Sequence, residues 1–109
     1  LFPSLRFSKL NFERGSFNEL VENIIKKGIV EQHYGVIGIR KLVSIVDMPP
    51  LQEVIDAKLI PHLVELSKQQ EYPRLQMEAL WILTNITSGS TFQCEEVVKR
   101  GGILWQWKC

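Results

Sequence analysis

The sequence has little cysteine and almost no net charge. Its 109 residues include two cysteines, and 13 Lys and Arg balance 12 Asp and Glu to leave a formal charge of +1. Two cysteines cannot build the disulfide framework of a small secreted domain, and no Cys or His cluster has the spacing of a zinc site. Such a small charge creates no general field that would attract nucleic acid or an anionic membrane. We therefore expect a reducing compartment, no nucleic-acid partner, no metal and no cofactor.

Long apolar runs are missing as well. The longest stretch without a charged residue covers 79–94, which is shorter than the roughly 20 apolar residues that a membrane helix needs, and it contains several Thr and Ser residues. No membrane span is expected. The chain starts at Leu1 without a basic-then-apolar signal segment, so we expect it to be a processed, cloned or fragmentary sequence.

What the sequence does contain is apolar spacing of helical type. Apolar residues make up 45% of the chain, and no stretch alternates long enough to predict a sheet, so the predicted class is all-α. Ser16 is a plausible N-cap for the first predicted helix, which ends at Gly28, and Pro73 precedes the longest later one. The predicted helices cover residues 17–28, 31–46, 51–57, 60–67, 75–87 and 92–100.

These helices repeat at an offset of 43 residues. The offset pairs Val36 with Ala79, Ile39 with Ile82, Val43 with Ile86, and residues 52–55 with 95–98. A period of roughly 40–47 residues is typical of HEAT and armadillo repeats, and a unit of one long, one short and one medium helix is closer to armadillo. We therefore predict a right-handed armadillo solenoid fragment, with an irregular arm over 1–16, about two repeats over 17–103 and an unmatched tail over 104–109.

The segment 75–90, followed by Val97-Val98 and Gly101-Gly102-Ile103, closely resembles an armadillo repeat of the importin-alpha (karyopherin-alpha) family. The residues that carry this resemblance are the family's ligand-binding signature, here Trp81, Asn85, Ser88 and Gly89. Upstream, residues 40–44 and 49–61 resemble the family's first repeat. The resemblance covers about residues 17–103.

Side-chain chemistry supports a binding role for the same positions. Residues four apart lie on one face of a helix, so Trp81 and Asn85 are neighbours, and other residues of that helix supply its core face. A carboxamide has one acceptor and two donors, so Asn85 can grip both the N–H and the C=O of an extended peptide. An indole face covers the stem of Lys or Arg and attracts its charged end. An isolated Trp on a helix is usually a core residue, and the accompanying Asn85 and Ser88-Gly89 argue against that interpretation.

The resemblance implies a nuclear-import adaptor without catalytic activity, present in cytoplasm and nucleus. Its partners would be cargo proteins with Lys/Arg-rich nuclear localisation signals, and importin-beta in a full-length parent, whose basic binding segment is not found here. The alternative is an armadillo scaffold that joins other proteins and has no part in nuclear import. An enzyme would need a titratable constellation that the sequence does not offer.

Several positions depart from the family pattern. Gly38 and Leu42 stand in the first unit where the second has Trp81 and Asn85, so one complete Trp/Asn element is present, and we expect weak peptide binding. Lys58 replaces a glycine that is usual in the family. Gly35 and Gly38 predict close helix packing. Because two repeats leave apolar surface uncovered, we expect marginal stability or self-association through Ile103, Leu104, Trp105 and Trp107.

Overall fold

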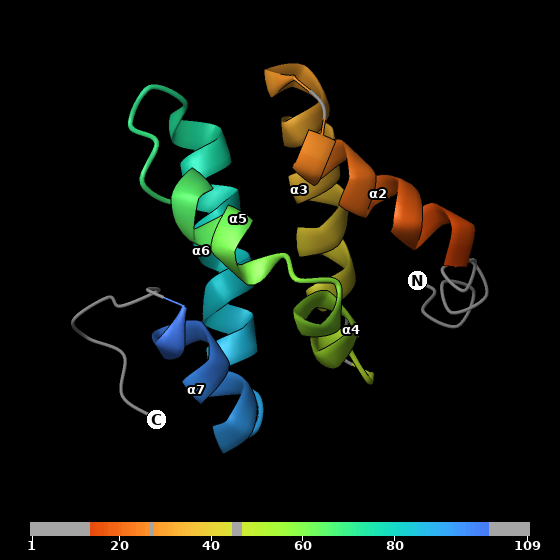
Figure 1. Cartoon of the computed structure of the whole chain (residues 1–109), viewed down its shortest axis with the longest axis vertical. Coiled ribbons are helices and arrows are strands. Elements are labelled where there is room, and N and C mark those ends of the chain that lie inside the picture. Colours follow the sequence, from red (N-terminus) through yellow and green to blue (C-terminus); the bar gives the residue numbers. More distant parts are fainter. Residues whose placement is uncertain (1–13, 27, 45–46, 101–109) are drawn as a thin grey trace.

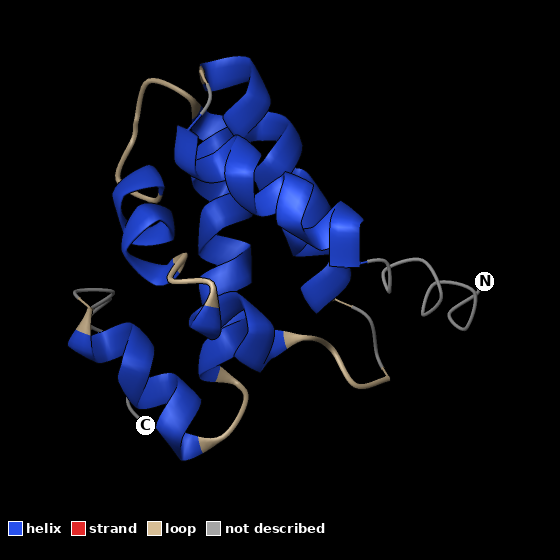
Figure 2. Ribbon diagram, turned by 45° about the vertical axis from the view of Figure 1, so that its right-hand side comes forward, coloured by secondary structure: helices blue, strands red, loops and turns tan. Residues whose placement is uncertain are grey.

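A computed structural model of the chain describes residues 14–26, 28–44 and 47–100. For residues 14–16 and 26 it describes the backbone alone. The described residues form helices and contain no strand (Figure 2). The helices are α2 (Arg14–Lys26), α3 (Ile29–Val43), α4 (Leu51–Asp56), α5 (Ile60–Leu66), α6 (Pro73–Thr87) and α7 (Thr91–Lys99). The predicted all-α class is confirmed. None of these helices is long and apolar enough to cross a membrane.

The two longest helices form the centre of the fold. α3 and α6 each have 15 residues, and they lie side by side and pack against each other (Figure 1). α2 packs on α3, while α5 and α7 pack on α6. The short helices α4 and α5 lead into the long helix α6, which gives the three-helix unit that the sequence predicts for an armadillo repeat.

The predicted repeat register agrees with the pattern of burial. At four of the pairs related by the 43-residue offset both members are buried, namely Val36 and Ala79, Ile39 and Ile82, Val43 and Ile86, and Val54 and Val97. Together with Ile24 of α2 and Leu63 of α5, all eight of these residues belong to one apolar cluster that runs through both units. Burial of this kind is the main favourable term in folding, so the repeat spacing directs the packing of the helices.

Close contact between α2 and α3 explains the glycines of α3. A Cβ atom added at Gly35 would lie 2.7 Å from the carbonyl oxygen of Leu20 and 2.9 Å from Cγ1 of Ile24. At Gly38 it would lie 2.6 Å from Cδ2 of Leu20. The helix backbones can approach this closely only because neither position has a side chain, which is the role predicted from the sequence.

Several predicted helix boundaries were wrong by a few residues. α2 begins at Arg14, so Ser16 lies inside the helix and is not its N-cap. α3 begins at Ile29 behind Gly28, which makes no side-chain cap bond, and ends at Val43 rather than at Val46. α6 begins at Pro73 itself, because proline fits the first turn of a helix, where its missing N–H costs no hydrogen bond.

The start of α7 has a side-chain cap that was not predicted from the sequence. The Ser90 Oγ accepts the N–H of Gln93 at 3.1 Å, and the Gln93 Oε1 accepts the N–H of Ser90 at 3.0 Å. This reciprocal pair is a capping box, which fixes the first residue of the helix at Thr91.

Lys58 has a backbone conformation that favours glycine. It connects α4 to α5 with a φ of 63°, in the left-handed region where a Cβ atom is strained. The family's usual glycine at this position, noted from the sequence, therefore has a physical explanation. The predicted tail and the cluster Ile103, Leu104, Trp105 and Trp107 lie outside the described residues, as do residues 1–13 of the arm.

Candidate functional site

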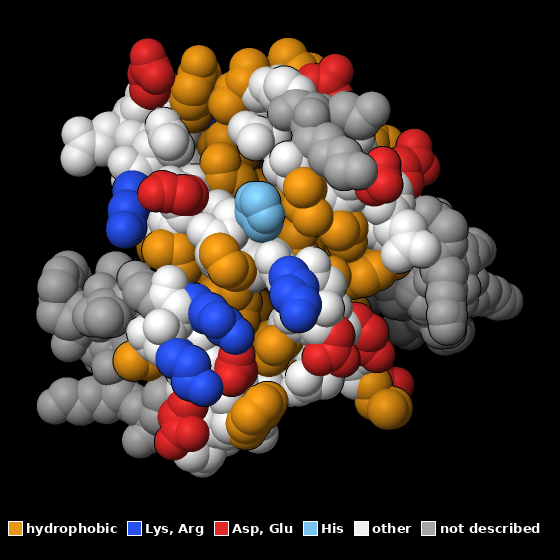
Figure 3. Space-filling model, viewed as in Figure 1, with side chains coloured by type: hydrophobic (Ala, Val, Ile, Leu, Met, Phe, Trp, Pro, Cys, Tyr) orange, Lys and Arg blue, Asp and Glu red, His pale blue; other side chains and the backbone are white. Residues whose placement is uncertain are grey.

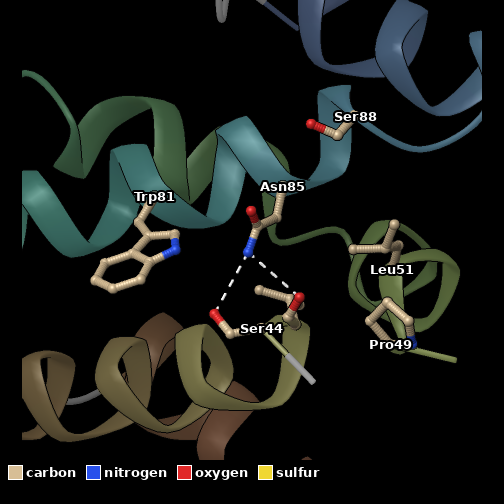
Figure 4. A pocket seen from close by; sticks show the side chains of 7 residues that line it. Ser44, Pro49, Leu51, Trp81, Asn85 and Ser88 are labelled. Atoms are coloured by element: carbon tan, nitrogen blue, oxygen red, sulfur yellow. Dashed lines mark hydrogen bonds between the residues drawn. The ribbon is translucent and has the colours of Figure 1, made fainter. Parts of the chain in front are cut away.

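An open pocket of about 440 Å³ lies where the C-terminal ends of α3 and α6 face each other (Figure 4). The loop before α4 and the first residue of α4 form its third side. Its lining combines one indole, one carboxamide, two hydroxyls and three apolar side chains, from Trp81, Asn85, Ser44, Ser88, Val43, Pro49 and Leu51. None of these lining residues is charged.

Three of the four residues singled out from the sequence line this pocket. Trp81 is 42% exposed, Asn85 is half-buried and Ser88 is exposed, so the face of α6 that carries them is open to solvent. Gly89 is not among the lining residues. A Cβ atom added there would collide with Oε1 of Gln93, which caps α7, so Gly89 gives the chain room to enter the next helix.

The carboxamide of Asn85 is oriented by the preceding repeat. Its Nδ2 donates to the carbonyl oxygen of Val43 at 3.3 Å and to the Oγ of Ser44 at 3.4 Å (Figure 4). Only the nitrogen end can donate to a carbonyl, so these contacts turn Oδ1 away from α3. We expected Asn85 to bind both the N–H and the C=O of a peptide. Both hydrogens of its amide already have partners within the protein, so only Oδ1 is available, as an acceptor for a donor of the ligand.

Ser44 and Ser88 likewise offer acceptors to a ligand, because their hydroxyl hydrogens are bonded within the protein. The hydroxyl of Ser44 donates to the carbonyl oxygen of Arg40 at 2.8 Å, and that of Ser88 donates to the carbonyl oxygen of Thr84 at 3.0 Å. A hydroxyl has a single hydrogen, so each serine that uses it on its own helix offers only lone pairs to a ligand. α3 and α6 also both end at the pocket, and the C-terminal end of a helix carries partial negative charge.

A buried carboxylate lies behind Trp81. Glu78 is 1% exposed, and its Oε1 accepts from Nε of Arg40 at 2.6 Å while its Oε2 accepts from Nε of Arg74 at 2.9 Å. The guanidinium of Arg40 in turn lies over the ring of Trp81, with Cζ 4.2 Å from the ring centroid. One face of the indole therefore already carries a cation from within the protein.

The charge of Glu78 is stabilised by these two arginines. Burial raises the pKa of the Glu78 carboxyl, but the hydrogen bonds and positive charges of Arg40 and Arg74 together outweigh burial and hold the pKa below its usual value of 4.5. The group is thus ionised at neutral pH, and Arg40 is held in place over Trp81.

Arg40, Ser44 and Glu78 belong to this site but were not predicted to do so. Arg40 and Ser44 lie in the segment that resembles the family's first repeat, and Glu78 lies in the segment 75–90 that contains Trp81. The 43-residue offset aligns Leu42 with Asn85 and so indicates that the end of α3 lies beside the end of α6, but it does not identify which side chains pair between the two helices.

Comparison with known proteins agrees with this architecture. Residues 47–88 match the family model of the Armadillo/beta-catenin-like repeat. The chain is also similar to a solved structure of a designed armadillo repeat protein, with a TM-score of 0.65 over 75% of this chain and 34% of that one, at 18% identity. At this identity the likeness shows the fold alone, and the predicted armadillo solenoid fragment is confirmed.

The sequence is also similar to importin subunits alpha. Over 64 residues it is 47% identical to importin subunit alpha-2 of Arabidopsis thaliana, 48% identical to importin subunit alpha-8 of Mus musculus and 47% identical to importin subunit alpha-B of Dictyostelium discoideum. Each alignment covers 59% of this chain but only 12% or 13% of the relative. The resemblance predicted from the sequence is confirmed for this armadillo region.

Proposed function

We propose that this armadillo region binds basic, extended peptides of the nuclear-localisation-signal type at the pocket of Trp81, Asn85 and Ser88, as part of a nuclear-import adaptor. The observation that carries the proposal is the polarity of the pocket. Ser44, Asn85 and Ser88 offer acceptors, because their own hydrogens are bonded within the protein, and they lie next to the half-exposed indole of Trp81, whose N–H is the one donor among the lining side chains. No catalytic step is part of the proposal.

A ligand that matches acceptors must supply donors. The main-chain N–H groups of an extended peptide and the ammonium of Lys are such donors, and the negative ends of α3 and α6 favour a cation at the same place. The methylene stem of Lys buries apolar area when it lies along the indole of Trp81 or the ring of Pro49. A carboxylate or phosphate, in contrast, would find no positive charge among the lining residues and no donor apart from the indole N–H of Trp81.

The position of the pocket between two repeats favours an extended ligand over a compact one. The pocket is formed by α3 of one unit and α6 of the next, so a further unit would place a similar site beside it. An array of such sites multiplies weak contacts through effective concentration. We propose on this basis, and on the likeness to importin subunits alpha, that cargo recognition, the partnership with importin-beta and the presence in cytoplasm and nucleus belong to a longer parent protein.

Isothermal calorimetry with a Lys-rich peptide tests the binding. A peptide in which every Lys is replaced by Gln provides the ligand control. We expect weak binding of the Lys-rich peptide, loss of about 1 kcal/mol or more of binding free energy in Trp81→Ala and in Asn85→Ala, and no measurable binding of the Gln peptide.

Phe92→Ala is the matched protein control, because Phe92 is a 57% exposed aromatic residue outside the pocket. Unchanged binding in Trp81→Ala and Asn85→Ala would contradict the site. Binding that is equally tight at high salt, or equal for the Gln peptide, would instead favour a protein-interaction scaffold, since exposed charge contacts weaken as the Debye length shortens.

A further inference from the structure

The indole of Trp81 contacts the guanidinium of Arg40, which in turn pairs with the buried carboxylate of Glu78. Glu78 and Trp81 are three residues apart on α6 and so lie on neighbouring positions of the helix surface. Arg40 comes from α3, pairs with the buried carboxylate of Glu78 through Nε and places Nη2 3.5 Å from the other oxygen. Its side chain is only 17% exposed, so the guanidinium is held between the carboxylate and the ring.

Arg40 cannot leave this place without removing one of the two partners of the buried Glu78 carboxylate. If it turned away, Glu78 would keep a single partner, Arg74, whose side chain is 58% exposed. A buried carboxylate that loses a charged partner is costly, so the covered face of Trp81 stays covered when a ligand arrives. A cation on the opposite face would also lie close to the charge of Arg40, and the two would repel each other.

We propose that Arg40 is a positioning residue that fixes the plane of Trp81 and reserves one indole face, so that the ring receives the apolar stem of a ligand's Lys and not its charged end. The ammonium is then directed to the acceptors of Asn85, Ser44 and Ser88. The placement of the ligand's Lys rests on the proposed function. The fixed plane of the Trp81 ring is a property of the protein without ligand.

The ring position is tested by acrylamide quenching of Trp81 fluorescence in the full chain, with Trp105→Phe and Trp107→Phe so that the emission comes from Trp81. In Arg40→Gln the quenching constant should rise about twofold, because the second of the two indole faces becomes accessible. Arg74→Gln is the matched control, since it removes the other guanidinium on Glu78 without touching the ring. Should Arg40→Gln fail to fold, Arg40→Lys is the second variant. It keeps a positive charge beside Glu78 but has no planar group to stack on the indole, so the quenching constant should rise by the same factor.

Selectivity is tested with two peptides that differ at one Lys, which is either unmodified or trimethylated. The trimethylated side chain keeps its charge and has no N–H to donate, so the wild-type chain should prefer the unmodified peptide. In Arg40→Gln the ratio of the two dissociation constants should move toward the trimethylated peptide by about threefold to thirtyfold, because a bare indole attracts a quaternary ammonium. Arg74→Gln should leave the ratio unchanged.

The outcomes separate the two proposals. Equal quenching in wild type and both Arg40 variants, or an equal rise in Arg74→Gln, overturns the positioning role of Arg40. An unchanged peptide ratio in Arg40→Gln overturns its role in selectivity. Failure of the wild-type chain to distinguish the Lys-rich peptide from its Gln counterpart overturns the proposed function and the selectivity role, and the quenching result then stands on its own.

Discussion

Replacement of Glu78 by glutamine tests the electrostatic frame behind Trp81. Glutamine has nearly the same volume, so the change removes a charge without opening a cavity. In the wild type the carboxylate is 1% exposed and accepts charge-assisted bonds from Arg40 and Arg74. In Glu78→Gln one of the two acceptor oxygens becomes an amide nitrogen, which is a donor and faces another donor.

The expected loss of stability depends on how deeply Arg40 and Arg74 are buried. Removal of one member of a buried pair costs about 3–5 kcal/mol when the remaining charge stays buried and unpaired. Here the remaining charges are on Arg40 and Arg74, which are 17% and 58% exposed and can reach water. A hydrogen bond to a charged group contributes about 1.5–3 kcal/mol, so we expect Glu78→Gln to lower the free energy of unfolding by about 2 kcal/mol at pH 7.

Urea unfolding followed by far-UV circular dichroism measures this loss, and its pH dependence checks the cause. Because the pKa of Glu78 is lowered in the folded chain, its ionisation contributes stability that is fully present above the unfolded value of 4.5. That contribution is lost as the pH falls below 4.5 through the folded pKa. The gap between wild type and Glu78→Gln should therefore narrow in acid.

Glu65→Gln is the control, because Glu65 is an exposed residue of α5. A surface change of this kind usually alters stability by less than about 0.5 kcal/mol. The reasoning is refuted if Glu78→Gln is as stable as the wild type at pH 7, or if the gap between the two keeps its size from pH 7 to pH 3.

Three further substitutions test the packing, the connection and the cap that shape the two units. Gly35→Ala should destabilise the chain by about 1–2 kcal/mol in urea unfolding, since the new Cβ meets a backbone oxygen and the clash outweighs the better helix propensity. Lys58→Gly should raise the thermal midpoint slightly, because relief of left-handed strain of about 1–2 kcal/mol exceeds the entropy cost of glycine of about 0.5–1 kcal/mol. Ser90→Ala should cost about 1 kcal/mol through loss of the cap of α7, and an unchanged unfolding midpoint would argue against that cap.

Spacing in the sequence was sufficient to predict the class and the repeat register. Val54 and Val97 are buried at equivalent places because a helix that repeats must bury the same face against each neighbour. Helix starts were less predictable. α3 begins behind Gly28, which offers no side chain to cap the helix, so its start has no local signal of that kind. α6 begins at Pro73, which fits the first turn of a helix but was predicted to lie before it.

The candidate site was predictable in part for a similar reason. Trp81, Asn85 and Ser88 lie on one helix face, which spacing reveals. The contacts that orient Asn85 and that pair Glu78 with Arg40 come from the preceding unit, 38 to 42 residues away. A single sequence holds no direct record of such contacts. Burial of Glu78 is harder still to predict, because a carboxylate is rarely buried unless it is paired. Helical spacing indicates its partner Arg74, four residues earlier on α6, but the partner Arg40 is identified only by the packed helices.

Binding of a donor-rich basic peptide at the acceptors between α3 and α6 is tested most directly by a ¹H–¹⁵N NMR titration of the chain with a Lys-rich peptide. We expect shifts that saturate together at the indole N–H of Trp81, the side-chain amide of Asn85 and the backbone amides of Ser44 and Ser88, and that are absent with the Gln-substituted peptide. Shifts confined to other surfaces, or identical shifts with both peptides, would contradict the account.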